Sequence, residues 1–179
     1  GLTEYFKSIR RNYVLAAPTG KAAKVIEQKT GSKASTIHKA IYAINDIKQY
    51  KEEVEGSETY KFYASLAAND DPVDTVYIID EASMISDIEE LLISQAKFGS
   101  GKLLTELLEY DKHPKSKFIF IGDPCQLPPI RGLESPALSP SYLQKHFNCG
   151  ADEFTLTEIM RQAGDSDLIM ATKKIRELR

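Results

Sequence analysis

The sequence predicts an α/β protein in which helices flank a mainly parallel sheet. Short apolar runs alternate with helical patterns along the 179 residues. The runs are continuous rather than alternately apolar and polar, as in strands that are buried on both faces of a parallel sheet. The first three runs also end in polar residues, at the strand ends where such sheets bind ligands. We expect strands near 13–17, 76–80, 117–121 and 154–157.

Helical patterns fill most of the intervals between these runs. KAAKVIEQK (21–29) follows the first run, and TIHKAIYAI (36–44) places isoleucines at helical spacing. Ser86 and Glu89 have the spacing of a capping box, which predicts a helix that continues through Gln95. Further helices are expected at 103–108, from Ser139-Pro140 with serine as the cap and proline in the first turn, and from Asp165 onward.

The segment 45–75 matches neither pattern. Its second half alternates Tyr60, Phe62 and Ala64 with Lys61, Tyr63 and Ser65, and EGSE separates it from IKQYKEEV. This arrangement predicts either a small β-hairpin or a mobile excursion between two strands of the core.

Composition limits the classes of function. A hydrophobic content of 42% indicates a packed core, and the net charge of −3 argues against nucleic-acid binding by charge alone. The two cysteines, Cys125 and Cys149, are too few for a zinc cluster or a disulfide framework. No apolar run has the roughly 18 residues of a membrane span, and no signal peptide pattern is present. We therefore expect a cytoplasmic protein without a membrane partner.

Two adjacent carboxylates, Asp80 and Glu81, end the apolar run VYIID. Neighbouring carboxylates repel, and partial burial raises that cost, so we expect a positive group nearby. An Asp at a strand end can hold Mg²⁺, usually through water, while the metal bridges nucleotide phosphates. A second acid beside it can orient and deprotonate an attacking water.

Two further residues fit the same chemistry. Gln126, after the third run, offers an uncharged donor and acceptor suited to a terminal phosphate, and Arg161 could place a guanidinium on a transferring phosphate. Each feature also has a simpler interpretation. Asp80-Glu81 can be a capping pair at a helix start, Gly122-Asp123 a turn, and Arg161 a surface or ion-pair residue. Taken singly, the residues leave these alternatives open.

Taken together and in this order, the motifs resemble one family. LAAPTGKAAK, STIH, VYIIDEASM, FIFIGDPCQLPPI and LTEIMRQ are similar to motifs Ia, Ib, II, III and IV of superfamily 1 DNA helicases. The similarity is greatest to the RecD-like branch, which contains the alpha subunit of exodeoxyribonuclease V. It extends from about Tyr13 to the C-terminus and is weakest over 45–75.

The resemblance implies a fold and an ATP site. The fold would be a partial RecA-like P-loop NTPase domain, whose strands of motifs Ia, II and III are parallel neighbours in that order. Asp80 would bind Mg²⁺, Glu81 would activate the hydrolytic water, and Gln126 would couple the γ-phosphate to elements that contact DNA. Arg161 would act on the γ-phosphate, so that Asp80, Gln126 and Arg161 would all serve the bound ATP.

The resemblance also implies a track for single-stranded DNA. Thr19, with Pro18 and Lys21, would contact the DNA backbone, at a helix start whose N–H groups favour phosphate. Thr36 and His38 would lie on the same track. A satisfied core or capping histidine is an equally good interpretation of His38.

The chain departs from the family in one respect. No segment matches the phosphate-binding pattern G-x-x-x-x-G-K-[ST]. Gly99-Ser100-Gly101-Lys102 is the nearest approach, but Leu103 stands at the Ser/Thr position, and the preceding residues suggest a helix. We expect a helix–helix turn there.

We therefore expect residues 1–179 to be motifs Ia to IV of a motor domain that lacks its P-loop strand, with 1–12 the tail of the preceding helix. The family places that strand between the motif III strand and the last one, a gap that 154–157 could fill. The intact protein would use ATP and Mg²⁺ and contain a second RecA-like domain, with other nuclease or helicase subunits as further partners. The fragment would be inactive and bind neither cofactor tightly. The alternative is a non-catalytic module that binds protein or DNA on the same scaffold through 45–75.

Overall fold

The central element is a four-stranded parallel sheet. The computed structural model of the chain describes residues 1–54, 57–89 and 96–156. The sheet has the order β2-β1-β5-β7. Its strands are β1 (Tyr13–Ala17), β2 (Ala34–Thr36), β5 (Val76–Ile79) and β7 (Lys117–Phe120). The three strands of motifs Ia, II and III are therefore parallel neighbours in the predicted order, and the predicted fold class is confirmed.

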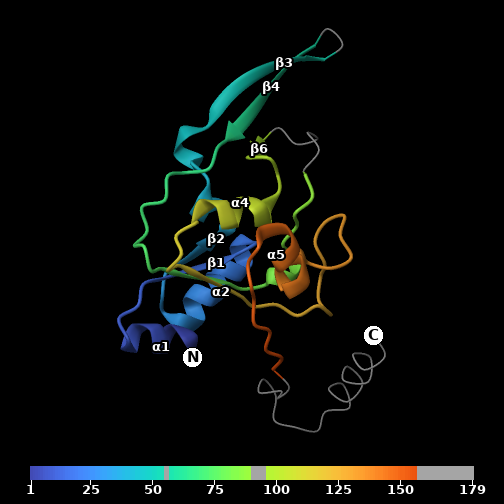
Figure 1. Cartoon of the computed structure of the whole chain (residues 1–179). Helices are drawn as coiled ribbons and strands as arrows, with labels where there is room; N and C mark the ends of the chain where they lie inside the picture. The colour runs from blue at the N-terminus through green and yellow to red at the C-terminus, as the bar shows by residue number, and fades with distance from the viewer. Residues whose placement is uncertain (55–56, 90–95, 157–179) are drawn as a thin grey trace.

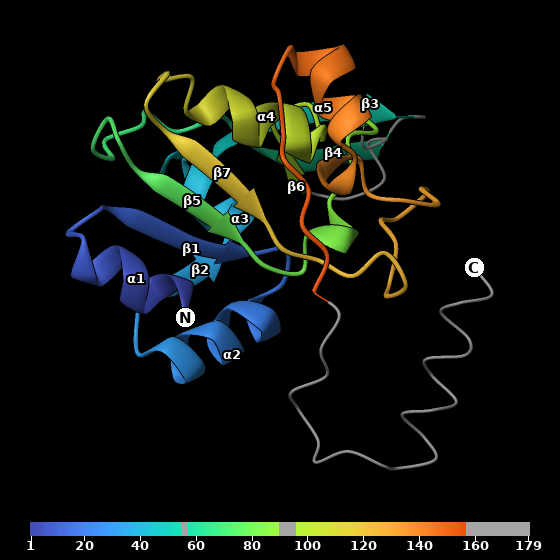
Figure 2. The ribbon, with the colours of Figure 1, turned by 60° about the horizontal axis from the view of Figure 1, so that its bottom comes forward.

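Helices cover both faces of this sheet (Figure 2). α1 (Leu2–Ser8) and α2 (Gly20–Thr30) lie on one face, where Phe6 and Ile26 pack with Val76 and Ile78 of β5. α3 (Ile37–Ile41), α4 (Leu103–Tyr110) and α5 (Pro140–Phe147) lie on the other face. There, residues of these helices pack with Tyr77 and Ile79. The alternation along β5 thus divides the core into two layers.

A β-hairpin projects from one end of the molecule (Figure 1). β3 (Lys48–Val54) and β4 (Ser57–Ala64) pair in antiparallel fashion within the 45–75 segment, and β6 (Ala96–Phe98) pairs parallel to β4. The base of the hairpin is attached to α3, because the Ala43 amide donates to the Ser65 carbonyl and the Ala67 amide to the Ile41 carbonyl. The hairpin is thereby connected to the helix that carries His38.

Helix boundaries follow the capping signals where these are strong. The Thr19 side chain accepts a hydrogen bond from the Ala22 amide at the start of α2, and Gly31 ends that helix with φ +61°. Ser139 caps α5 and Pro140 stands in its first turn, as predicted. The expected helix over 36–44 is shorter, since α3 ends at Ile41 and the following Tyr42 is extended.

One predicted strand and the start of one predicted helix are wrong. Residues 154–156 form no strand, and Phe154 and Leu156 are 88% and 93% exposed. Strand residues need a paired neighbour to hold them extended, and none lies beside this segment among the described residues. Residues 86–89 form no helix either, because the side chain of Asp87 bonds instead to Thr105 and Tyr142. The rest of that expected helix, and the one from Asp165, lie outside the described residues.

The Gly99–Lys102 turn joins a strand to a helix and not two helices as predicted. It connects β6 to α4, with Gly99 at φ +50° and Gly101 at φ +85°. Its amides are used within the chain, since Ser100 donates to the Glu106 carboxylate at 2.7 Å and Gly101 donates to the Phe98 carbonyl. The buried Glu106 also accepts from the Tyr42 hydroxyl. This turn therefore already contains an anion, the carboxylate of Glu106.

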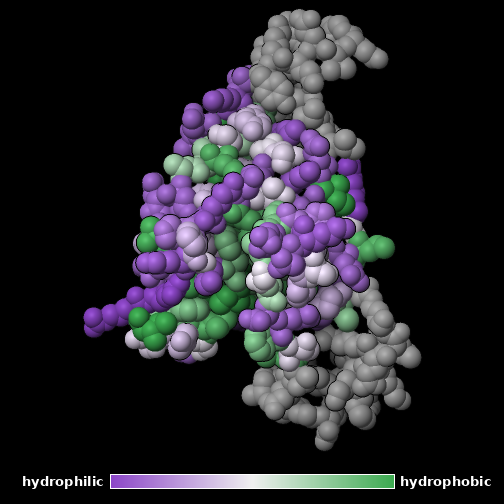
Figure 3. All heavy atoms as spheres, in the orientation of Figure 1, coloured by the Kyte–Doolittle hydropathy of each residue, from purple (hydrophilic) through white to green (hydrophobic). Residues whose placement is uncertain are grey.

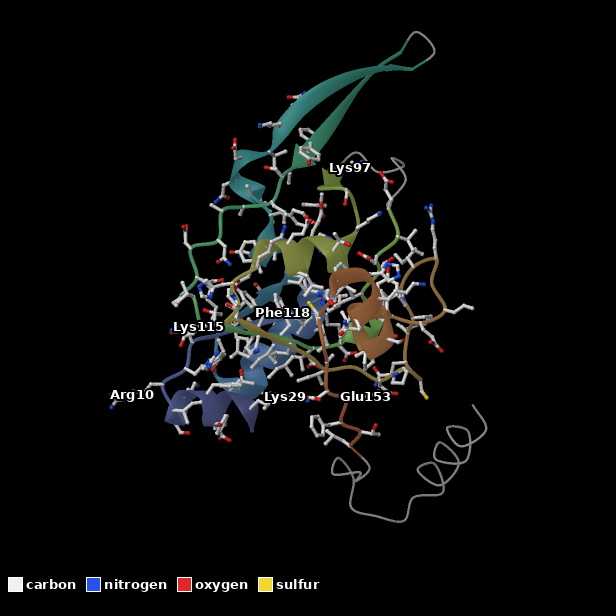
Figure 4. All side chains as sticks on the ribbon, viewed as in Figure 1. Arg10, Lys29, Lys97, Lys115, Phe118 and Glu153 are labelled. Atoms are coloured by element: carbon white, nitrogen blue, oxygen red, sulfur yellow. The ribbon has the colours of Figure 1, made fainter. Side chains whose placement is uncertain are left out.

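One edge of the sheet is unpaired in the described part of the chain. β7 pairs with β5 on one side only, and Phe118, Ile119 and Phe120 are half-buried. Figure 3 shows apolar surface across the centre of the molecule as seen in Figure 1. Figure 4, in the same view, labels Phe118 of β7 in this region. The family resemblance places the P-loop strand at this edge.

A network of polar side chains fixes the amino ends of the strands. The buried Tyr77 donates to Asp71 at 2.9 Å and accepts from Asn69 at 3.1 Å. Nearby, the 8%-exposed Asp111 accepts hydrogen bonds from the His113 amide and the Ser116 hydroxyl, both at 2.8 Å. Burial alone would raise the pKa of Asp111, but these hydrogen bonds together bring its pKa below the ordinary value.

Asp111→Ala is therefore expected to lower the free energy of unfolding at pH 7 by about 1–3 kcal/mol, because the His113 amide and the Ser116 hydroxyl lose a charged, buried acceptor. A lowered pKa stabilises the fold above the unfolded-state value of about 3.9, and this contribution disappears as the pH falls through the folded-state pKa. The difference between parent and variant should shrink below about pH 4 in urea unfolding series. Asp70→Ala, which removes an exposed carboxylate nearby, is the control. A difference that stayed constant down to pH 3 would contradict this assignment.

Candidate active site

A pocket of about 740 Å³ lies at the carboxyl ends of β1, β5 and β7. Its lining includes five of the residues that the sequence singled out: Thr19, Lys21, Asp80, Glu81 and Gln126. They come from three separate segments, and the parallel register of the strands brings them to one edge of the sheet. This is where an open α/β sheet binds its ligand.

Asp80 and Glu81 lie at the end of β5, and both are half-buried. The Asp80 amide still donates to the Ala16 carbonyl of β1 at 3.0 Å, but Glu81 leaves the strand direction with a left-handed φ of +54°. A residue with a side chain in this conformation carries strain of about 1–3 kcal/mol. The surrounding structure must supply the contacts that hold it, and such strain is typical of functional sites.

Neither carboxylate acts as a helix cap in the described structure. Glu81 precedes the short helix η2 (Ala82–Met84) without a capping hydrogen bond from its side chain. Asp80 Oδ1 accepts from the neighbouring Glu81 amide at 2.9 Å, its one hydrogen bond within residues 1–54, 57–89 and 96–156. The capping interpretation of this pair is therefore not supported, and both side chains line the pocket.

The turn after Glu81 is packed tightly against the end of β7. The Ala82 amide donates to the Ile121 carbonyl at 2.8 Å. At Gly122, a Cβ atom would lie 2.8 Å from the Ser83 amide nitrogen and 2.9 Å from a methyl group of Leu138. Only glycine fits this approach without displacing backbone.

The start of α2 forms a second wall of the pocket. Thr19, Lys21 and Ala22 line it, and Thr19 is the cap of the helix. The first amides of an eleven-residue helix together with a lysine in its first turn favour a bound phosphate. Pro18 is half-buried just before this turn.

Gln126 lies in the exposed loop that follows β7. Its backbone amide donates to the Asp123 carbonyl, and its side chain approaches Asp123 Oδ2 at 3.4 Å. A second, adjoining pocket of about 440 Å³ is lined by Glu81, Ser83, Cys125 and Gln126 among others. Gln126 therefore stands between the two pockets and beside Glu81.

Thr36 and His38 do not line the pocket. Thr36 caps α3 by accepting from the Lys39 amide at 3.1 Å. The His38 ring packs against Tyr42 and Phe98, with centroids 5.6 and 5.1 Å away, which favours the structural interpretation of this histidine. Its contact with DNA stays a prediction. Arg161 lies outside the described residues.

The charges of the pocket fit a hydrated cation and a phosphate. Asp80 and Glu81 form no ion pair within the described ranges, although Lys21 lines the same pocket. No cluster of three His, Cys, Asp or Glu side chains that could hold a metal occurs in this part of the chain. Magnesium in nucleotide sites needs no such cluster, because one or two carboxylates hold it together with water and substrate phosphates. Asp80 fits that arrangement.

A parallel sheet with acidic and amide side chains at its carboxyl edge is typical of P-loop NTPase domains. A family model described as an AAA domain matches residues 1–179, and the chain belongs to this family of helicase-like P-loop NTPases. The family implies the use of a nucleotide and Mg²⁺ by the intact protein.

Two curated proteins are also similar in sequence to this chain. The chain is 30% identical over 158 residues to the ATP-dependent RecD2 DNA helicase of Deinococcus radiodurans, covering 88% of this chain and 16% of that protein. It is 30% identical over 171 residues to an uncharacterized protein of Acanthamoeba polyphaga mimivirus, covering 84% of this chain and 28% of that protein. The resemblance to RecD-like superfamily 1 helicases is confirmed. The chain spans less than a third of the length of either relative.

One negative finding concerns membranes. Within residues 1–54, 57–89 and 96–156, no helix has the length and apolar character needed to cross a bilayer.

Gly122→Ala is expected to destabilise the protein by about 1–3 kcal/mol, because the added methyl group would overlap backbone at the turn after Glu81. Thermal unfolding measures this effect. Gly150→Ala is the matched control, since the nearest atom to a Cβ there is a side-chain oxygen of Gln144 at 3.9 Å. Equal melting temperatures for both variants would show that the turn accommodates the methyl group, and would contradict the prediction.

Proposed function

We propose that this chain is part of the first motor domain of an ATP-dependent DNA helicase that couples ATP hydrolysis to movement on single-stranded DNA. One observation carries the proposal: Asp80, Glu81 and Gln126 line a single pocket together with the helix start of Thr19 and Lys21. The similarity to a RecD2 helicase supports it. A role in DNA repair or recombination, or as an exodeoxyribonuclease subunit, belongs to the same proposal.

The proposed roles follow from chemistry and position. Asp80 holds the hydrated Mg²⁺ of the nucleotide, which offsets charge on the phosphates. Glu81 accepts a proton from the attacking water, for which its carboxylate lies at the strand end beside Asp80. Gln126, between the two pockets, hydrogen-bonds the terminal phosphate, and Arg161 acts on the same phosphate.

DNA contact is proposed for the start of α2. Thr19, Pro18 and Lys21 contact the phosphate backbone there, and Thr36 and His38 continue the track along the start of α3. The second RecA-like domain of the full-length protein completes the ATP site. Residues 1–179 alone are proposed to be inactive, because they contain no G-x-x-x-x-G-K-[ST] segment.

A non-catalytic binding module on this scaffold is the second candidate. The projecting hairpin β3–β4 favours it, since this segment is not needed to build the pocket. ATP turnover by the full-length protein separates the two candidates, because a binding module hydrolyses no ATP with or without DNA.

Glu81→Gln in the full-length protein is expected to lower the rate of ATP hydrolysis by about 10²–10⁴-fold while nucleotide affinity is retained. The amide preserves the shape of the side chain but cannot accept the proton of the attacking water. Steady-state kinetics with single-stranded DNA and nucleotide titration measure the two quantities. The exposed Glu89→Gln is the control. Parental turnover by Glu81→Gln would remove Glu81 from the reaction.

Lys21→Glu is expected to weaken binding of single-stranded DNA irrespective of its sequence. Loss of one phosphate contact should reduce the slope of log K against log salt by about 0.7. Fluorescence titrations at several salt concentrations measure this slope. Lys115→Glu makes the same change of charge before β7, at the opposite end of the strands (Figure 4). If both variants had the same effect, DNA would respond to overall charge and not to the start of α2.

A further inference from the structure

Ser135 contacts the turn of Glu81 from a distant part of the chain. Its hydroxyl lies 2.7 Å from the Ala82 carbonyl and 2.9 Å from the Ile85 carbonyl, across 53 and 50 residues of sequence. The residue is only 7% exposed. Its oxygen also lies 3.3 Å from the Ala137 amide, which donates to it at the start of η3 (Pro136–Leu138). One buried hydroxyl therefore joins η3 to both ends of the turn after Glu81.

The two carbonyls define the part of the chain that Ser135 holds. Ala82 follows Glu81 directly, and Ile85 follows the last residue of η2. Both residues are fully buried, so no water could replace a lost donor there. The Ala82 carbonyl also accepts from the Ile85 amide at 3.2 Å, so the Ile85 carbonyl is the one that depends more on Ser135. Because Glu81 itself has a strained backbone, its position depends on what holds the next peptide.

The loop that carries Gln126 begins and ends on this same turn. At its start, Ile121 accepts from the Ala82 amide and Gly122 packs on the Ser83 amide. At its end, the single hydroxyl proton of Ser135 is shared between the carbonyls of Ala82, the first residue of η2, and Ile85, the residue after it. The loop of Gln126 is therefore attached at both of its stems to the peptides next to Glu81.

We propose that Ser135 is a positioning residue for ATP hydrolysis, which fixes the turn of Glu81 and couples it to the Gln126 loop. The inference rests on the proposed function, because it assigns Ser135 to the reaction of Glu81. A purely structural serine would cap η3 and affect stability alone.

The test compares Ser135→Ala with Ser139→Ala in the full-length protein. Ser139 is likewise a serine cap, accepting from the Tyr142 amide at the start of α5, but it bonds to no residue of the Glu81 turn within the described structure. Steady-state ATPase kinetics with and without single-stranded DNA give kcat and KM, and thermal unfolding gives the stability of each variant.

Ser135→Ala should lower DNA-stimulated kcat by about ten- to a hundredfold with KM for ATP unchanged, since a misplacement of about 1 Å can cost a hundredfold. Ser139→Ala should keep the parental kcat even if its melting temperature falls. Ser135→Thr, which restores the hydroxyl, should recover most of the rate. Parental kcat in Ser135→Ala, or equal losses in both alanine variants, would overturn the inference.

If Ser135→Ala does not fold, hydrogen exchange of the parental protein tests whether the Gln126 loop is coupled to the Glu81 turn. Binding of single-stranded DNA should change exchange at amides 82–85 together with those of 123–135. A change confined to 123–135 would overturn the coupling while leaving the proposed function intact. Absence of ATP hydrolysis by the parental protein would instead overturn the proposed function, and this inference with it.

Discussion

The parallel register of β1, β5 and β7 is the constraint on which the rest of the structure depends. Tyr13 lies opposite Val76, and Val76 opposite Lys117, so the three strands start and finish together. Their carboxyl ends then place the start of α2, the Asp80-Glu81 pair and the Gln126 loop around one pocket. A slip of one residue in β5 would turn Val76 and Ile78 to the opposite layer and carry Asp80 away from this edge.

Close packing behind the pocket is the second requirement. The left-handed backbone of Glu81 is unfavourable by itself, and the contacts that offset it come from the end of β7 and from η3. Gly122 permits the approach of one segment, and the buried hydroxyl of Ser135 satisfies the carbonyls presented by the turn. The exposed Gln126 thus lies on a loop whose two stems are both bonded to the turn after Glu81.

Local patterns predicted the elements that local physics determines. The continuous apolar runs identified β1, β5 and β7, and the serine and proline at 139–140 identified the start of α5. The strand β2 was not predicted, because Ala34–Thr36 has no apolar pattern and is held in place by pairing with β1. The contact of Ser135 with Ala82 spans 53 residues, so no local signal could reveal it. Residues 154–156 were expected to form a strand but have no partner strand in the described structure, and sequence pattern alone did not make a strand.

The turn at Gly99–Lys102 has glycines before a lysine, as phosphate-binding loops do, but this sequence feature alone does not make a phosphate site. The strand before it and α4 after it give a context that resembles a phosphate-binding loop more than the sequence suggested. A phosphate, however, needs amides that are not already bonded. The Glu106 carboxylate accepts from the Ser100 amide, and any Cβ at Gly99 would collide with that carboxylate. An anion brought to this turn would have to displace a buried negative charge that Tyr42 also bonds. By contrast, the start of α2 and Lys21 line an open pocket, and the carboxylates there, Asp80 and Glu81, lie at the end of the neighbouring strand β5. The charge of the surrounding side chains and the open pocket, and not glycine spacing, therefore distinguish the candidate site from the Gly99–Lys102 turn.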